Sequence, residues 1–304
     1  MFIISGTTEF NIPEKTVVTI GKFDGIHKGH MAIIERMKKY IPRGYKLCVL
    51  TFDMPPASLG FGGDKGTLMT NAEKRIVFSE IGVDYYIEFP FYEKTASIPA
   101  RDFIEEFIVD RMNAKAVVVG DDCSFGQGAL GNGQMLRDFG PIYDYEVEVI
   151  ERIKKGGRII SSTYLRELVA KGDVNKVIEC AYRPYFVMGK FRRDIVNVGG
   201  GVSYYVMDIP EEKILPLDGV YYTKALYEDE FYPAITNVDS KRRVVETYLY
   251  GGIRGIARGR VSIAFFEWKR EELKYYKLSD INKKIKTDIF DGQKWHKEHS
   301  CKLT

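Results

Sequence analysis

The sequence predicts an α/β protein of two domains, in which a doubly wound parallel sheet is followed by a small antiparallel β-barrel with a closing helix. In the first half, short apolar runs alternate with segments whose apolar residues recur at helical spacing. Beyond residue 182 the pattern changes to short strands separated by turns. The length of 304 residues suits one large or two ordinary domains. We therefore expect domains at residues 1–182 and 183–304.

The first domain is expected to alternate strands and helices. Buried strands are predicted from runs of β-branched and other apolar residues, and helices from apolar stripes such as Met31, Ile34 and Met37. The expected strands are 17–20, 45–51, 83–89 and 116–120, and the expected helices are 31–41, 70–81, 99–112, 161–172 and 173–178. In such sheets ligands lie beyond the carboxyl ends of the strands. Residues 21–30 and 120–126 both fall there.

The second domain is expected to be a barrel because its short strands follow one another at close spacing. The expected strands are 185–190, 202–207, 219–226, 231–235, 244–249 and 261–266. A closing helix is predicted over roughly 279–289, with Ser279 as its N-cap. The polar composition of 291–304 favours a disordered tail.

The bulk composition excludes several classes of protein. Hydrophobic residues make up 45% and charged residues 29%, as in globular proteins, and no apolar run approaches the ~20 residues of a membrane helix. We see no signal peptide, and four scattered cysteines without metal-ligand spacing read as reduced thiols, so a cytoplasmic location is expected. A net charge of +3 is too small to indicate nucleic-acid binding. The sequence does not predict an oligomeric state.

The string G-x-F-D-G-x-H-x-G-H, at residues 21–30, joins a strand to a helix. A glycine turn at a helix N-terminus directs backbone N–H groups and the positive end of the helix dipole toward an anion. His27 and His30 are three residues apart, so both rings can offer N–H donors on one side. This arrangement suits the α-phosphate of a nucleotide. A pair of surface histidines in a loop is the ordinary alternative, but it does not account for seven specified residues in ten positions.

This string resembles the signature of the HxGH nucleotidyltransferases, and its Phe-Asp-Gly form is similar to the bacterial FAD synthetases. Those enzymes usually join an FMN adenylyltransferase to a riboflavin kinase. The resemblance implies that ATP and FMN are substrates, that Mg²⁺ is a cofactor and that His27 and His30 are catalytic. It further implies an ATP-binding set and two flavin-side residues near the end of the second strand. These are Gly21, Phe23, Asp24, Gly25 and Gly29 for ATP, and Asp53 and Pro55 for flavin.

Two later motifs extend the resemblance. Residues 120–126 (GDDCSFG) look like the family's segment on the flavin side of the site, which implies contacts from Asp121, Asp122 and Phe125. An ordinary turn is an equally good interpretation of this segment alone. Residues 161–166 (SSTYLR) are similar to the family's Ser-Ser-Thr-x-x-Arg motif, which closes over ATP. The corresponding residues are Ser161, Ser162, Thr163 and Arg166. Hydroxyls that merely cap a helix are the alternative there, although an arginine one turn later can bind phosphates as a fork.

The barrel resembles riboflavin kinase but departs from it at one point. That family holds Mg-ATP with a Gly-x-Pro-Thr-Ala-Asn string, whereas residues 199–208 read GGGVSYYVMD. The threonine position falls on Tyr204 or Val206, neither of which offers a small hydroxyl to Mg²⁺. Asp208 takes the place of the asparagine, and Glu246 stands where the family keeps its general base. We therefore expect a barrel that is not active as a kinase, with Glu246 as a vestigial base.

The function expected from the sequence is that of an FAD synthetase, which transfers AMP from ATP to FMN and gives FAD and pyrophosphate. Positioning and charge neutralisation by His27, His30 and Arg166 would carry the rate. Two alternatives stay open. One is a bifunctional enzyme whose kinase works through unfamiliar residues. The other is a flavin-binding regulatory protein without catalysis, which would not need the histidines and the arginine. The expected partners are small molecules only (ATP, FMN and FAD), with no membrane and no nucleic acid.

Overall fold

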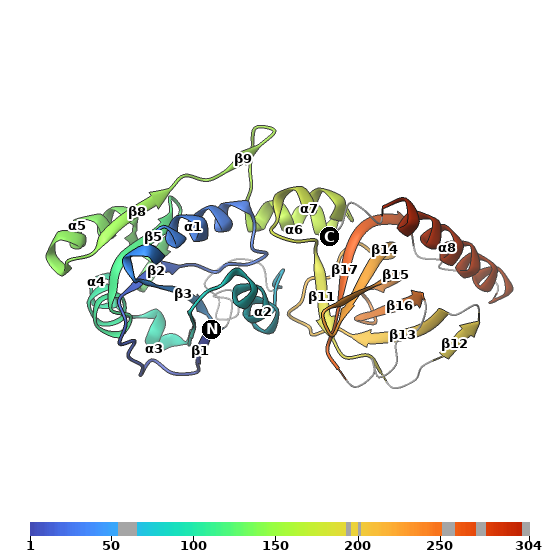
Figure 1. Cartoon of the computed structure of the whole chain (residues 1–304), viewed down its shortest axis with the longest axis horizontal. Helices are drawn as coiled ribbons and strands as arrows, with labels where there is room; N and C mark the ends of the chain where they lie inside the picture. The colour runs from blue at the N-terminus through green and yellow to red at the C-terminus, as the bar shows by residue number, and fades with distance from the viewer. Residues whose placement is uncertain (54–65, 193–195, 200–201, 251–258, 272–277, 300–304) are drawn as a thin grey trace. The chain divides into compact units, whose positions relative to one another are not determined.

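The computed structural model describes residues 1–53, 66–192, 196–199, 202–250, 259–271 and 278–299 (Figure 1). The chain divides into two compact units, Met1–Ser162 and Thr163–Thr304. The first unit holds a parallel sheet with helices and the second an antiparallel sheet, so the predicted fold class is confirmed. The domain boundary at residue 182 stays a prediction.

The sheet of the first unit has six strands, and every neighbouring pair is parallel. Its strands follow the spatial order β1-β4-β3-β2-β5-β8. The central strands are rich in valine and almost wholly buried because both faces of the sheet are covered, as parallel sheets require. The strands are β1 (Phe2–Ser5), β2 (Thr16–Ile20), β3 (Lys46–Phe52), β4 (Tyr85–Phe89), β5 (Ala114–Gly120) and β8 (Glu146–Ile150).

The strand order reverses at β2. From β2 the chain proceeds to β3 and β4 on one side, and then returns to place β5 on the other. A crevice forms where loops leave in opposite directions, and ligands of open α/β sheets bind there. The loops that follow β2 and β5 therefore meet at the edge where the sequence predicts the site. Gly120, at the end of β5, leaves room for the Asp122 carboxylate, whose Oδ1 would be 2.9 Å from a Cβ at this position.

The predicted helices of the first unit are present, and one of them differs in its winding. The stripe of Phe103, Ile104, Phe107 and Ile108 is buried as expected, but the segment is π-helical. Neither α5 nor the small hairpins were predicted from the sequence. The elements are α1 (Lys28–Lys38), α2 (Asn71–Ile81), α3 (Glu93–Ala96), α4 (Ala100–Asp102), η3 (Phe103–Arg111), α5 (Gly133–Tyr143), the turns η1 (Ile41–Arg43) and η4 (Gln127–Ala129), and the hairpins β6 (Ser124–Phe125) with β7 (Gly131–Asn132) and β9 (Lys154–Lys155) with β10 (Arg158–Ile159).

The second unit is a seven-stranded antiparallel sheet in the order β11-β17-β14-β15-β16-β13-β12. Phe191, just beyond β11, bridges Met207 of β13, so the sheet curls toward closure as a half-barrel. Buried threonine hydroxyls link three of its strands, from Thr223 to Thr236 (2.7 Å) and from Thr236 to Thr247 (3.1 Å). The strands are β11 (Phe186–Gly189), β12 (Val196–Gly199), β13 (Val202–Asp208), β14 (Gly219–Tyr227), β15 (Glu230–Asp239), β16 (Val244–Tyr250) and β17 (Val261–Arg270).

Three helices accompany this sheet: α6 (Ser162–Ala170), α7 (Val174–Cys180) and α8 (Leu278–Glu298). The expected disordered tail over 291–304 is wrong as far as Glu298, because α8 continues that far. Trp295 stacks on Tyr222 with ring centroids 4.9 Å apart, and buried His296 donates from Nε2 to the Ala234 carbonyl at 2.9 Å. The segment is therefore polar in overall composition, but one face of its helix packs against the sheet.

Within the described part of the chain, the structure contains no helix long and apolar enough to cross a membrane. Cys48, Cys123 and Cys180 form no disulfides, as expected, while Cys301 lies outside the described residues.

Candidate active site

The loop after β2 is built by backbone conformation. Gly21 donates its N–H to the Leu50 carbonyl at 3.1 Å, which ties the loop to β3. Phe23 adopts a left-handed φ of +47°, a strained value for a residue with a side chain. Its buried ring meets Phe78 of α2 edge-on, with centroids 5.4 Å apart, and lies 5.0 Å from the His30 ring. Phe23 is thus an anchor that packs the loop against α2.

Asp24 fastens this loop to the segment that leads into α2. Its buried carboxylate accepts hydrogen bonds from the Thr67 hydroxyl (2.8 Å) and from the backbone N–H groups of Leu68 (3.1 Å) and Met69 (2.9 Å). The Asp24 backbone carbonyl also accepts a hydrogen bond from Ser162 at 2.7 Å. These contacts hold Asp24 in place within the first unit, and its assignment to ATP binding stays a prediction.

His27 and His30 cap α1 reciprocally. His27 is the N-cap residue, and its Nδ1 accepts the backbone N–H of His30 at 3.3 Å. The backbone N–H of His27 in turn donates to His30 Nδ1 at 3.3 Å. The two rings stack with centroids 3.7 Å apart and an angle of 18° between their planes. The capping box that usually needs a hydroxyl and a carboxylate is made here by two imidazoles.

This capping determines the protonation of both rings. Because each Nδ1 accepts a hydrogen bond, the proton of each neutral ring sits on Nε2. Burial lowers the pKa of His27 from 6.5 to about 4, although the nearby Asp24 carboxylate opposes the shift. Burial, followed by the charges of His27 and Lys74, lowers the pKa of His30 well below 6.5. At neutral pH the pair therefore offers two Nε2–H donors and no net charge.

The surroundings of Gly29 explain why this position of the motif is a glycine. A Cβ at this position would lie 3.0 Å from both Cε1 and Nδ1 of His27, closer than ordinary van der Waals contact. The glycine thus lets the His27 ring lie against the first turn of α1. Gly25 has a φ of +82°, which explains a glycine before the helix.

The serine-rich motif opens α6. Ser162 is the first residue of the helix and donates to Asp24, as described above, while Arg166 lies one turn further along. Ser161 precedes the helix and Thr163 is exposed on its first turn. Of these four sequence-predicted residues, the structure shows Ser162 in contact with the loop that carries the histidines.

The residues predicted to lie on the flavin side differ in their burial and in their partners. Asp53 accepts the Phe91 N–H at 2.8 Å through its carboxylate, and it follows β3 at the predicted edge. Asp121 forms an ion pair with Arg152 at 2.8 Å, and Asp122 is exposed beside it. The Phe125 ring is buried in the core, 5.7 Å from Phe103, and not on the surface of the loop. Pro55 lies outside the described residues.

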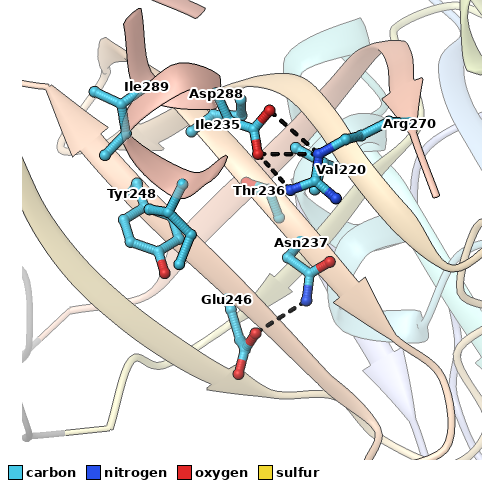
Figure 2. Close-up of a pocket in the computed structure, with 10 residues that line it drawn as sticks. Val220, Ile235, Thr236, Asn237, Glu246, Tyr248, Arg270, Asp288 and Ile289 are labelled. Atoms are coloured by element: carbon cyan, nitrogen blue, oxygen red, sulfur yellow. Dashed lines mark hydrogen bonds and ion pairs between the residues drawn. The ribbon is translucent and has the colours of Figure 1, made fainter. Parts of the chain in front are cut away.

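Glu246 of the second unit lines a pocket of about 160 Å³ between the sheet and α8 (Figure 2). Its Oε1 accepts from the Tyr204 hydroxyl (3.1 Å) and from Arg242 (2.9 Å), and its Oε2 accepts from Asn237 (3.0 Å). Burial and Glu246 itself raise the pKa of Tyr204, which keeps that hydroxyl a donor. Arg270 and buried Asp288 of α8 also line this pocket and pair with each other. The carboxylate of Glu246 is therefore engaged on both oxygens.

Sequence reasoning missed two groups around the histidines. One is the segment 67–69, which holds Asp24 through the Thr67 hydroxyl and two backbone N–H groups, and the backbone donors leave no side-chain signal in the sequence. The other is Lys74 of α2, which is 6% exposed and acts electrostatically on His30. In the sequence it reads as one more solvated lysine of an amphipathic helix.

Two family models match the chain. Residues 9–164 match the family model described as FAD synthetase, and residues 181–296 match the model described as riboflavin kinase. Curated relatives include the bifunctional riboflavin kinase/FMN adenylyltransferases of Escherichia coli K12 (26% identity over 286 residues, 90% of this chain and 91% of the relative) and Bacillus subtilis (26% over 300 residues, 90% of each).

A protein of the same name from Pseudomonas fluorescens is 24% identical over 287 residues and 90% of each chain. Among solved structures, one from Streptococcus pneumoniae, titled a macrolide-efflux protein, shares the fold with a TM-score of 0.81 at 23% identity. It covers 96% of this chain and 98% of the other. Because the family model spans half of the sequence and contains the histidine loop, the chain belongs to the FAD synthetase family.

Proposed function

We propose that this protein is an FMN adenylyltransferase, which forms FAD from FMN and ATP. A phosphate oxygen of FMN attacks the α-phosphorus of ATP, the bond from that phosphorus to the α–β bridging oxygen breaks, and pyrophosphate leaves. The FMN phosphate is itself the nucleophile, so the reaction needs no nucleophile from the protein. What it needs is alignment of two anions and stabilisation of charge on the transferring phosphoryl group.

The observation that carries this proposal is the neutral histidine pair. His27 and His30 hold their Nε2–H groups at the N-terminus of α1, because both Nδ1 atoms are used for capping. Pre-aligned donors of this kind stabilise developing charge without reorganising during the reaction. A general acid or base would need a pKa near the operating pH, which burial denies to both rings.

The remaining contacts are assigned by family resemblance and local position. Gly21, Gly25 and Gly29 would admit ATP close to the loop backbone, with Phe23 and Asp24 holding the loop in shape. Ser161, Ser162, Thr163 and Arg166 would meet the β- and γ-phosphates, for which a guanidinium is suited. Asp53, Pro55, Asp121, Asp122 and Phe125 belong to the flavin side of the proposal.

Mg²⁺ is proposed to arrive with ATP. The described residues contain no cluster of three histidine, cysteine or carboxylate side chains that would cage a metal ion. Mg²⁺ commonly binds through substrate phosphates and water with one or two carboxylates, which fits a site of this composition. When bound, it would neutralise phosphate charge, while the protein's own groups align the reactants.

We further propose that the barrel does not phosphorylate riboflavin. Val206 is the register partner of Glu246 on the neighbouring strand, so an aliphatic side chain faces the position of the base. Asp208, in place of the family's asparagine, is paired with Arg192 through two hydrogen bonds, which lower the pKa of Asp208. The base and the nucleotide position are both occupied by partners from the protein itself.

The second candidate is the bifunctional enzyme, which the names of the curated relatives and the pocket beside Glu246 favour. One experiment separates the two. The full chain is incubated with Mg-ATP and either FMN or riboflavin, and the flavins are resolved by chromatography, with Glu246→Gln as a control. FAD from FMN and no FMN from riboflavin are expected. FMN formation that Glu246→Gln abolishes would establish the bifunctional enzyme, and no product from either flavin would favour the regulatory protein.

A further inference from the structure

A cavity of the first unit lies at the edge of the sheet opposite to the histidine loop. Its volume is about 520 Å³, which is typical of small-molecule sites. The neighbouring strands β3, β2, β5 and β8 contribute residues at their amino-terminal ends, and α5 contributes the remaining wall. Lys15 and Gly21 lie on either side of the extended strand β2, which separates them by roughly 20 Å. The cavity is therefore distinct from the proposed adenylyl-transfer site.

The lining of this cavity has more positive than negative side chains. Arg43 donates to the Glu146 carboxylate from both terminal nitrogens, at 2.6 and 3.1 Å, so these two charges are already paired. Asp144 lies 3.6 Å from Lys115 with its side chain 97% exposed, which makes this ion pair weak. The two remaining charges are positive. The charged lining residues are Lys15, Arg43, Lys115, Arg137, Asp144 and Glu146.

Lys15 and Arg137 carry the excess of positive charge. Both residues are exposed, and no carboxylate among the described residues pairs with either of them. Lys15 directly precedes β2, whereas Arg137 belongs to the second turn of α5, so two separate elements supply the cations. A guanidinium binds two phosphate oxygens as a fork, and an ammonium adds a compact point charge. This pair is therefore suited to a phosphate group.

Tyr45 and Pro141 add apolar surface to the same lining. The Tyr45 ring is held in place, because it stacks on Tyr40 with centroids 5.9 Å apart and the Arg43 guanidinium lies 4.9 Å from its centroid. Pro141 follows Arg137 by four residues in α5, so the two share one face of the helix. A ligand that suits both parts of the lining has an anionic group and a small apolar part.

We propose that this cavity binds a small organic phosphate monoester, with its phosphate on Lys15 and Arg137 and its apolar part against Tyr45 and Pro141. A monoester carries nearly two negative charges at pH 7, which match the two positive charges in excess. The site does not depend on the proposed adenylyl transfer, because none of its residues belongs to the motifs assigned to ATP or flavin.

The first test uses phenyl phosphate as the probe. It is titrated into the ¹⁵N-labelled full chain, and we expect saturable NMR shifts of the backbone amides of Lys15, Tyr45 and Lys115. Inorganic phosphate, which lacks the apolar part, should bind more weakly at the same amides. Shifts that increase without saturation, or shifts confined to residues 21–30, would overturn the proposal.

The second test compares charge-removing variants. Lys15→Gln and Arg137→Gln should each weaken phenyl phosphate binding about fivefold, which corresponds to the loss of one exposed charge contact. Both should melt at the wild-type temperature, because both side chains are exposed. Lys94→Gln, which removes an exposed charge from α3, is the matched control and should keep wild-type affinity. Equal affinities in all three variants would contradict the assignment.

FAD formation separates this site from the proposed function. Lys15→Gln and Arg137→Gln should keep the wild-type kcat, and a loss of kcat in either would contradict a separate site. A wild type that forms no FAD would refute the proposed function, while the phenyl phosphate titration would still decide on this cavity.

Discussion

His27 and His30 stack ring on ring, 3.7 Å apart, and each Nδ1 accepts the backbone N–H of the other residue. This reciprocal contact completes the N-terminus of α1 and leaves both Nε2–H groups as donors. One feature thus serves folding and chemistry together. Substitutions here should separate the two effects.

His30→Ala should lower kcat for FAD formation by about 10²–10³, with only a modest change in KM for FMN, because the lost donor acts on the transferring phosphoryl group. Steady-state kinetics with varied FMN and saturating Mg-ATP measure both constants. His299→Ala, which removes a histidine just after the end of α8, should keep wild-type kinetics. Retention of most of the kcat by His30→Ala would remove this ring from catalysis and support the regulatory alternative.

The first unit should lose stability as the pH falls from about 6.5 toward 4. The pKa of His27 is depressed to about 4 in the folded state, so between these values the unfolded chain binds more protons and stability rises with pH. The contribution of His27 is roughly 3 kcal/mol above this window. Urea unfolding at pH 4.5 and 7 measures it. His27→Asn retains an N-cap acceptor without a titratable ring and should reduce the pH dependence; an unchanged dependence would contradict the assignment.

Gly29→Ala should lower kcat about tenfold. The new Cβ would displace the His27 ring by a few tenths of an ångström and misalign its Nε2–H. Gly44→Ala is the comparison, because Gly44 has a φ of +79° with open space around it. That variant should cost about 1–2 kcal/mol of stability and leave kcat unchanged. Equal kcat values for the two variants would show that the ring position does not matter.

Arg166→Lys should raise KM for ATP or lower kcat, because an ammonium cannot reproduce the bidentate fork of a guanidinium on phosphate oxygens. The affinity for FMN, followed by fluorescence quenching, should not change. A loss of FMN affinity with intact ATP kinetics would place Arg166 on the flavin side.

Asp288→Ala should loosen α8 from the barrel. The buried carboxylate of Asp288 binds Arg270 and, at 3.1 Å, Lys269, so its removal leaves two partly buried cations without this partner. We expect a loss of roughly 3 kcal/mol, measured by urea unfolding with Trp295 fluorescence. Lys294→Ala, which removes one partner of an exposed pair with Glu298, should cost less than 1 kcal/mol. Similar losses in both variants would mean that the buried pair adds nothing to docking.

The alternation of strands and helices and the histidine loop could be predicted from sequence because their signals are local. Apolar periodicity identified β2, β3, β4 and β5, and the glycines and histidines of residues 21–30 specify a turn and a helix start within ten positions. The edge strands β1 and β8 were not predicted from the sequence. Both are partly exposed, and partial exposure weakens the apolar pattern that indicates a buried strand.

The sequence by itself determined the fold class, the family and the residues on which the proposed chemistry depends, since all of these lie in short runs of specified residues. Only the tertiary structure decided that Asp24 fastens the loop, that both imidazoles are neutral donors and that Lys74 of α2 is buried. It also decided that α8 continues to Glu298. Each of these facts depends on what a side chain meets across the fold, because burial and hydrogen-bond partners set both its ionisation and the stability of its segment.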